Sequence, residues 1–230
     1  MIDGPTGRDG PHVFVADLDH PVLDDADRHH LARVLRLRTG DRFTVSDGDG
    51  RWRPARFGSA IEPDGDVATV SAPAPHVTVA FSLVKGDRPE WVTQRLTEMG
   101  VDHIRPFSAS RSVVRWDERR ARAANERMQR IAREAAMQSR RCRLPQVWPL
   151  GTWAEVARLD GAVMAERDAP PLGLAHPTVL IGPEGGWSQE ELSVGLTKVG
   201  LGDHVLRSET AALAAGAILT YLRAAAQRTP

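Results

Sequence analysis

The first third of the chain contains short apolar runs separated by turn residues. Four runs have the length of strands: "HVFVA" (12–16), "RFTVSD" (42–47), "RWRPARFGSAI" (51–61) and "VATVSA" (67–72). Asp49-Gly50 is a strong hairpin signal between two of them. One helix is expected among the strands, over 25–37, because apolar residues recur there at helical spacing. We therefore predict a small, mostly β domain over residues 1–72.

The pattern changes after a short linker. Pro73 and Pro75 break regular structure, so residues 73–76 are expected to connect two domains. Beyond them, apolar strands alternate with amphipathic helices. Strands are expected at 77–84, 101–107, 161–166 and 178–182, with "QVWP" and "HVL" as further short runs. Helices are expected at 85–100, 117–138, 152–158, 188–199 and 209–226. This alternation predicts a mostly parallel sheet with helices on both faces over residues 77–230.

A glycine-rich turn lies in "VLIGPEGGWSQEEL" (179–192), between an expected strand and an expected helix. Ser188 and Glu191 form a capping-box pattern at the helix start. Glu184 in the turn and Glu190 in the first helical turn place more carboxylates where a phosphate would otherwise bind. The turn therefore favours close backbone approach to a ligand without phosphate. An ordinary tight turn, with glycines for positive φ, is the alternative.

Three junctions between strands and helices are rich in polar residues: 164–171, 181–188 and 201–212. Ligands of parallel α/β sheets bind beyond the carboxyl ends of the strands, so these junctions are candidates for a site. The third contains Arg207, Ser208, Glu209 and Thr210 directly before an alanine-rich helix. Such a cluster taken alone is usually only a helix cap.

Composition limits the function classes. The chain has 230 residues, of which 41% are hydrophobic and 26% charged, as in globular proteins with a buried core. No apolar run is long enough for a membrane span, and the N-terminus does not resemble a signal peptide. Cys142 is the only cysteine and the histidines lack ligand spacing, so we expect no disulfide and no metal site. A reducing cytoplasm is the simplest location.

Charge is unevenly distributed although the net charge is zero. Residues 111–143 contain 11 arginines and four acidic residues, a charge of +7, which leaves −7 on the rest of the chain. A basic segment on an otherwise acidic protein indicates a polyanionic partner. A solvated helix with internal ion pairs, such as Glu126 with Arg130, is the alternative.

Several stretches together resemble the RsmE family. "LIGPEGGWSQEEL" followed by "LGDHVLRSETAALAAGAIL" is similar to its C-terminal signature. "LVKGDRPEWVTQRLTEMGVDHIRPFSASRSVV" (83–114), "AMQSRRCRLPQV" (136–147) and "HHLARVLRLRTGD" (29–41) are similar to its other motifs, in the same order. The chain departs from the family at Arg95, Met137, Arg140 and His204, where lysine, glutamate, glycine and arginine are usual. These departures leave the glycine turn and the Arg-x-Glu-Thr stretch intact.

The resemblance implies a fold, a reaction and a cofactor. Members are SPOUT-class methyltransferases that use S-adenosylmethionine to methylate N3 of one uridine in 16S ribosomal RNA of the small ribosomal subunit. It implies a parallel α/β sheet with a C-terminal trefoil knot, a small N-terminal PUA-like β-barrel, and a homodimer. The implied cofactor-binding residues are Leu180, Gly182, Pro183, Glu184, Gly185, Gly186, Leu201, Gly202, Leu206 and Ser208. An acidic turn suits this cofactor, because its sulfonium is cationic and it has no phosphate.

Arg207 and Glu209 are the candidate catalytic residues. Arg207 would stabilise a carbonyl oxygen of the base as charge develops on the ring. Glu209 would orient Arg207 or accept the N3 proton, while a purely structural Arg207–Glu209 ion pair is an equal alternative. The candidates for RNA contacts are Arg33, Arg36, Arg111, Arg140 and Arg141. A non-catalytic RNA-binding protein, or a SPOUT enzyme acting on another ribosomal or transfer RNA base, remains open at this point.

Overall fold

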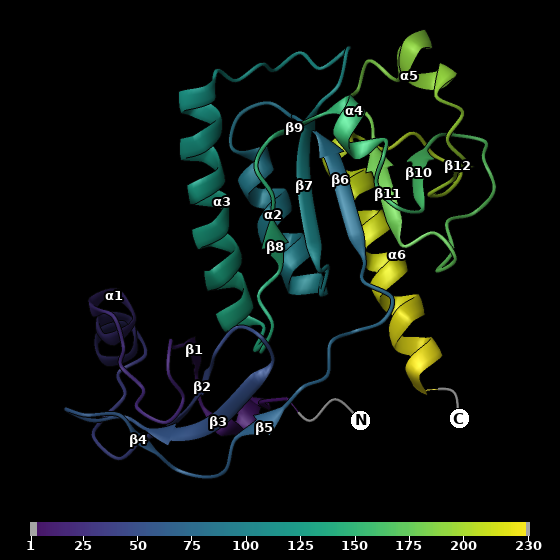
Figure 1. The fold of residues 1–230 in the computed structure, drawn as a ribbon. Coiled ribbons are helices and arrows are strands. Elements are labelled where there is room, and N and C mark those ends of the chain that lie inside the picture. Colours follow the sequence, from purple (N-terminus) through teal and green to yellow (C-terminus); the bar gives the residue numbers. More distant parts are fainter. Residues whose placement is uncertain (1–3, 229–230) are drawn as a thin grey trace. The chain divides into compact units, whose positions relative to one another are not determined.

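The computed structural model describes residues 4–228, which form two compact units (Figure 1). Unit 1 contains the chain up to Pro73 together with residues 133–144, and unit 2 contains residues 74–132 and everything from Pro145 onwards. The expected boundary assigned residues 77–230 to one domain. The structure instead places residues 133–144 with unit 1, because three of their arginines bind its backbone and side chains. None of the described helices is long and apolar enough to cross a membrane.

Unit 1 is built on a five-stranded sheet. Its elements are η1 (Gly7–Asp9), β1 (His12–Phe14), α1 (Asp25–His29), η2 (His30–Val34), β2 (Arg42–Ser46), β3 (Arg51–Arg56), β4 (Glu62–Pro63) and β5 (Ala68–Thr69). The order is β1-β2-β3-β4, with β5 also paired to β3. Only the β1–β2 pair is parallel among these. Leu31, Phe43 and Val45 are fully buried at the centre of its core.

The helix expected over 25–37 is shorter and less regular than its pattern predicts. α1 passes into η2, a single π-helical turn, and Arg36 then adopts a left-handed conformation with φ of 59°. A left-handed residue cannot continue a right-handed helix, so the helix ends before it. The π-helical turn and Arg36 leave Arg33, Val34 and Leu35 exposed to solvent.

Residues 133–144 are held in unit 1 by long-range hydrogen bonds. Arg133 binds the buried Asp27 through its two terminal nitrogens, Nη1 and Nη2, at 3.1 and 2.5 Å. The same guanidinium donates to the Phe14 carbonyl at 3.2 Å. The side chain of Arg143 donates to the Val70 carbonyl at 3.1 and 3.2 Å. This segment is thus an integral part of the small unit.

Unit 2 contains a seven-stranded sheet in which every pairing between named strands is parallel, so the parallel α/β fold is confirmed. Its strands are β6 (Thr78–Ser82), β7 (His103–Ser108), β8 (Gln146–Val147), β9 (Gly151–Thr152), β10 (Ala162–Ala165), β11 (Thr178–Ile181) and β12 (Lys198–Val199). The order is β12-β10-β11-β6-β7-β8, and β9 pairs with β7. β11 and β6 are therefore central, and the chain leaves β11 through the glycine turn.

Helices cover both faces of this sheet. They are α2 (Arg88–Met99), α3 (Glu118–Gln138), α4 (Trp153–Val156), α5 (Gln189–Ser193) and α6 (Ser208–Arg228). Alternate residues of β11 separate the two layers: Val179 and Ile181 pack with the core under α2, α3 and α6. Leu180 packs on the opposite side, with Trp187 and residues of α4 and α5. Continuous apolar strands are what a sheet buried on both faces requires.

Two expectations near the C-terminus were wrong. The helix expected at 188–199 ends at Ser193, and Lys198–Val199 instead forms β12 beside β10. Gly195, with φ of 75°, turns the chain back towards the sheet edge. The "HVL" run at 204–206 is not a strand but part of the loop before α6.

Candidate functional site

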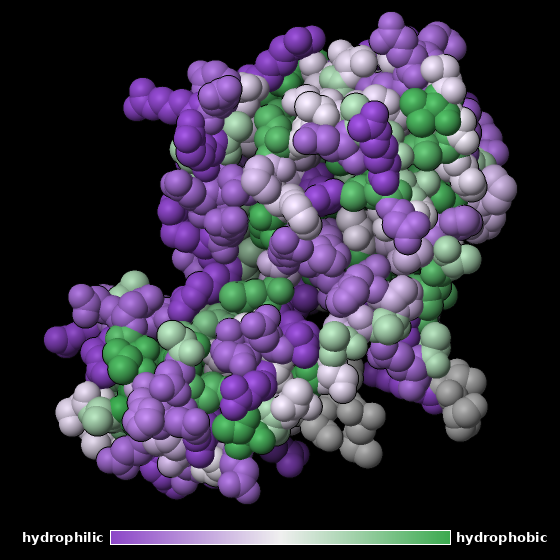
Figure 2. All heavy atoms as spheres, viewed as in Figure 1, coloured by the Kyte–Doolittle hydropathy of each residue, from purple (hydrophilic) through white to green (hydrophobic). Residues whose placement is uncertain are grey.

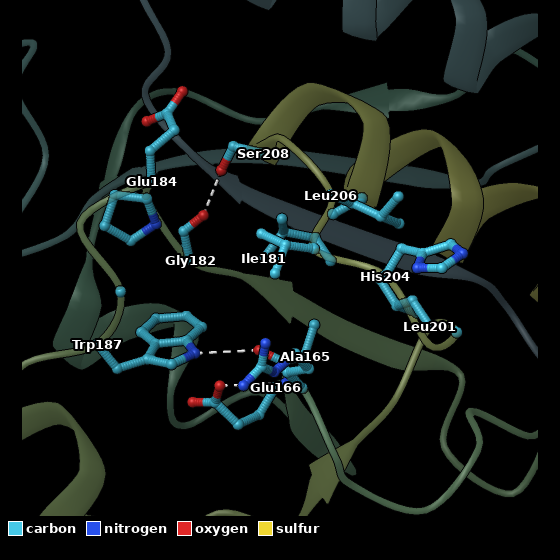
Figure 3. Close-up of a pocket in the computed structure, with 16 residues that line it drawn as sticks. Ala165, Glu166, Ile181, Gly182, Glu184, Trp187, Leu201, His204, Leu206 and Ser208 are labelled. Atoms are coloured by element: carbon cyan, nitrogen blue, oxygen red, sulfur yellow. Dashed lines mark hydrogen bonds between the residues drawn. The ribbon is translucent and has the colours of Figure 1, made fainter.

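A pocket of about 210 Å³ lies in unit 2, where β10 and β11 end and α6 begins (Figure 3). Three segments line it, and all three belong to the junctions that the sequence singles out. The lining residues are Ala165, Glu166, Arg167, Ile181, Gly182, Pro183, Glu184, Gly186, Trp187, Leu201, Gly202, His204, Val205, Leu206, Ser208 and Ala211. The position beyond the carboxyl ends of parallel strands is where ligands of such sheets bind.

The glycine turn is packed so closely that a side chain at its first position would not fit. A Cβ on Gly182 would lie 2.8 Å from the ring of Trp187. Trp187 cannot easily move, because its indole N–H donates to the Ala165 carbonyl at 3.1 Å. Its ring also stacks on Phe107, with centroids 6.3 Å apart and planes 7° from parallel. Gly182 therefore leaves room for the indole, which forms one wall of the pocket.

Ser208 connects the glycine turn to the start of α6. Its hydroxyl donates to the Gly182 carbonyl, as Figure 3 shows. The same hydroxyl lies 3.4 Å from the hydroxyl of Ser82, at the end of the central strand β6. Ser208 is buried. Ser208 thus joins the start of α6 to the glycine turn and to the end of β6.

The lining combines apolar side chains with a few charged ones. Ile181, Leu201 and Leu206 supply an apolar surface that suits a flat aromatic base. Glu166 and Glu184 supply carboxylates, and Arg167, which also lines the pocket, is paired with Asp168 at 3.1 Å, so the lining favours a cationic ligand over phosphate. These features fit S-adenosylmethionine, which carries an adenine, a sulfonium and an amino-acid tail. The backbone at Gly186 would reach its adenosine directly, since this residue lines the pocket and the space where its Cβ would lie is empty.

Eight of the ten residues expected to bind the cofactor line this pocket, and two do not. Leu180 is fully buried and points to the other face of the sheet. Gly185 faces away from the pocket, with its missing Cβ 3.3 Å from the Cβ of Arg111. The alternation along β11 explains Leu180, because Ile181 is the residue on the pocket side.

Sequence reasoning also missed lining residues. Glu166 and Arg167 follow β10 in the 164–171 junction, where the sequence pattern points to no individual residue. Trp187 was treated as part of the turn and not as a wall. His204, at which the family pattern is broken, is exposed and lines the pocket. Knowing that β10 lies next to β11 would have identified these residues, but hydrophobic periodicity does not reveal the order of strands in a sheet.

Arg207 and Glu209 do not pair in the structure. Glu209 instead forms an ion pair with Arg88 at the start of α2, at 3.2 Å. Residues two apart at a helix start project in different directions, so Glu209 turns towards α2 while Arg207 remains exposed. Within the described chain, Arg207 has no ion pair, and the buried Oε2 of Glu209 has no hydrogen-bond partner.

The five arginines expected to contact RNA have different surroundings. Arg33 and Arg36 are exposed. Arg140, with φ of 59°, donates to the Gly10 carbonyl, so its guanidinium has a structural role in unit 1. Arg141 is half-buried, and its backbone amide donates to the Ala136 carbonyl at the end of α3. Arg111 is exposed and donates to the Gly185 carbonyl at 3.1 Å.

Comparisons with known proteins agree with this arrangement. Residues 71–220 match the family described as "RNA methyltransferase domain", and residues 23–62 match "RNA methyltransferase PUA domain". The chain is 35% identical to the ribosomal RNA small subunit methyltransferase E of a Synechocystis strain, over 83% of this chain and 69% of that protein. It is 29% identical to the enzyme of that name from Bacillus subtilis, over 84% of this chain and 86% of that one.

A solved structure gives the same result in three dimensions. It is the ribosomal RNA small subunit methyltransferase E from Neisseria gonorrhoeae bound to S-adenosyl methionine. The TM-score is 0.77 at 28% identity, and the match covers 93% of this chain and 98% of that one. The sequence motifs, the parallel sheet with its terminal pocket and these likenesses lead to one conclusion: the chain belongs to the RsmE-type family of RNA methyltransferases.

Proposed function

We propose that this protein transfers a methyl group from S-adenosylmethionine to N3 of one uridine in 16S ribosomal RNA of the small subunit. The observation that carries the proposal is the pocket itself: an acidic glycine turn in a chain of the RsmE type. The relatives named above are small-subunit methyltransferases, and one of them binds this cofactor. We also propose a cytoplasmic location, which a ribosomal RNA substrate supports. The C-terminal trefoil knot stays a prediction from the family resemblance.

The residues of the pocket have distinct tasks in this proposal. Ile181, Leu201 and Leu206 hold the adenine, and the glycine turn binds through its backbone. Glu166 or Glu184 balances the positive charge of the ligand. The cofactor supplies the methyl group. What the protein adds is orientation, because methyl transfer requires donor, methyl and acceptor nitrogen to be in line and close.

Arg207 is our candidate for stabilising the uracil ring. Transfer of the N3 proton to solvent water leaves negative charge on the two carbonyl oxygens beside N3. A guanidinium directed at one of them stabilises that charge more strongly in the transition state than in the bound substrate. Arg207 is exposed and free of ion pairs among the described residues, so it is available for this contact. Glu209 is engaged with Arg88 and is not assigned to orient Arg207.

Exposed arginines provide the contacts to RNA phosphates. Arg33 and Arg36 in unit 1 and Arg111 in unit 2 are all exposed. The surface over α3 is largely hydrophilic in the view of Figure 2. Phosphate contacts position the RNA, and the pocket selects the base. N3 takes part in Watson–Crick pairing, so the target uridine must be flipped out or lie in an open structure.

We also propose a homodimer. The small residues of α6 that would allow close helix packing are used within the chain: a Cβ on Gly216 would lie 2.7 Å from the Leu96 side chain. The outer side of α6 is different, because it exposes Tyr221 by 73% and Ala217 as well. These two side chains lie four positions apart on one face of the helix, and we assign that face to the association of two copies. Family membership supports it further.

A methylation assay tests the proposed reaction. Small-subunit RNA transcribed in vitro and unmodified small subunits are incubated with methyl-labelled cofactor, and the modified nucleoside is identified by mass spectrometry. We expect 3-methyluridine at one site, seen also as a stop in primer extension because N3 is blocked. Methylation of a different base or of transfer RNA would contradict the proposed substrate. Cofactor binding without any methyl transfer would indicate a non-catalytic RNA-binding protein.

A further inference from the structure

Residues 109–112, which follow β7, form a closed turn outside the cofactor pocket. The Ser112 amide donates to the Ala109 carbonyl at 3.1 Å. The Ser112 hydroxyl in turn accepts a hydrogen bond from the Ala109 amide at 3.2 Å. These two bonds close the turn at both ends, and they make its central residues, Ser110 and Arg111, a rigid pair. The positions of Ser110 and Arg111 therefore depend on the contacts that the whole turn makes with the rest of the protein.

The buried carboxylate of Glu191 holds it. One oxygen of Glu191 accepts a hydrogen bond from the Ser110 amide at 2.8 Å, across 81 positions of sequence. The other oxygen accepts from the Ser188 amide at 2.7 Å, in the capping box that starts α5. The residue is only 1% exposed. A carboxylate with one bond to each loop fixes the 109–112 turn against the end of the glycine turn.

The consequence is the placement of Arg111. Its Nη1 donates to the Gly185 carbonyl in the glycine turn at 3.1 Å. The Cα of Gly185 approaches so closely that a Cβ there would lie 3.3 Å from the Cβ of Arg111. The guanidinium is exposed, and within residues 4–228 its other nitrogens make no hydrogen bond. Arginine has five donors in a rigid fork, so one edge remains free for an acceptor such as phosphate.

We propose that Glu191 is a positioning residue for RNA binding, which acts by holding Arg111 beside the cofactor turn. The proposal rests on the proposed function, since it assigns the free edge of Arg111 to a phosphate of the RNA substrate. Glu191 itself touches neither RNA nor cofactor. Its role is to fix the arginine before the RNA arrives, so that less conformational freedom is lost on binding.

The sign of the effect distinguishes this role from simple electrostatics. A carboxylate near an RNA site repels the phosphates, so removing its charge should tighten binding if charge alone matters. The proposal predicts the reverse for Glu191→Gln, because the amide group keeps one hydrogen bond and meets the second backbone N–H with a donor. Glu190→Gln is the matched control, since Glu190 is exposed and precedes Glu191 in the same helix.

The test is a double-mutant cycle on RNA affinity. Binding of unmodified small-subunit RNA transcribed in vitro is measured for the parent, Glu191→Gln, Arg111→Gln and the double variant. We expect about tenfold weaker binding for each single variant, the size of one lost charge-assisted hydrogen bond. The double variant should be no weaker than Arg111→Gln. The logarithmic salt dependence should fall by about 0.7 to 0.9 in all three variants, as for one lost phosphate contact.

A second variant that displaces the Arg111 side chain keeps the test valid if Glu191→Gln folds poorly. Gly185→Ala leaves the carboxylate untouched but crowds the Arg111 side chain. It should weaken RNA binding in the parent and have no effect in the Arg111→Gln background. Additive losses in either cycle, or an unchanged or tighter RNA affinity in both Glu191→Gln and Gly185→Ala, would overturn the proposal. A parent protein that neither binds nor methylates this RNA would instead refute the proposed function.

Discussion

Lowering the pH should destabilise unit 1 through one buried histidine. His12 is 3% exposed, and its two ring nitrogens lie 2.8 Å from the Thr44 hydroxyl and 3.0 Å from the Ser46 hydroxyl. Burial lowers the pKa of His12 to about 4; a hydrogen bond with the Arg141 backbone opposes this shift, and the nearby charge of Arg140 adds to it. In the unfolded chain the pKa of histidine is about 6.5. Between these two values the unfolded state binds a proton that the folded state excludes.

The magnitude follows from linkage between protonation and folding. The free energy of unfolding is unaffected by the titration of His12 well above pH 6.5, and it falls as the pH drops towards the folded-state pKa of about 4. For one histidine with these two pKa values, the loss is about 2 kcal/mol at pH 5 and about 3 kcal/mol at pH 4. Such a loss is a large share of the roughly 5 to 15 kcal/mol that stabilises a typical domain.

Urea unfolding at several pH values, followed through the backbone amide signals of β2 in NMR spectra, would measure this loss in unit 1 itself. His12→Gln removes the titrating group and should flatten the pH dependence between 6.5 and 4. His20→Gln is the control, because the His20 side chain is 87% exposed. Direct titration of the His12 ring signals gives an independent value. A His12 pKa near 6.5, or an equally steep pH dependence in His12→Gln, would refute the reasoning.

Three further predictions concern unit 2. Gly182→Ala should weaken cofactor binding in calorimetry by at least about tenfold, since the new Cβ would lie 2.8 Å from the Trp187 ring; parent-like affinity would show that the pocket is misplaced. Asp102→Asn should lower the free energy of unfolding by about 3 kcal/mol, because Arg223 loses its buried ionic partner; a loss below about 0.5 kcal/mol in urea titrations would contradict this. Tyr221→Glu should convert the dimer into a monomer of 25.1 kDa in light scattering, whereas a parent that is already monomeric would refute the dimer.

Signals at helix ends were more reliable in this protein than the periodicity that set helix lengths, which failed over 25–37 and 188–199. Ser188 and Glu191 form the capping box that their spacing predicts, with the Glu191 amide 3.2 Å from the Ser188 hydroxyl. α2 likewise ends at the left-handed Gly100, the last residue of the helix expected at 85–100. These features depend on residues within four positions of each other. Sequence spacing determines such contacts because a helix turn fixes which side chains meet.

Contacts between distant segments could not be predicted, because no spacing in the sequence determines which of these segments meet. The second bond of Glu191, to the Ser110 amide, spans 81 positions and has no periodic signal. Glu209 was matched to the nearby Arg207, but the packing of α2 against α6 brings Arg88 to it. A basic residue near an acidic one in sequence does not define a pair, because the fold decides which faces meet. The same limit applies to Arg140, whose partner is the Gly10 carbonyl.

The return of residues 133–144 to unit 1 has a consequence for modularity. The chain passes between the two units three times, after Pro73, Ala132 and Leu144, so no single cut separates them. A fragment that ends at the linker would lack Arg133 and leave Asp27 as a buried carboxylate without its guanidinium, at a cost of about 3 to 5 kcal/mol. An RNA-binding cassette could therefore not be transplanted from this protein as its first 72 residues.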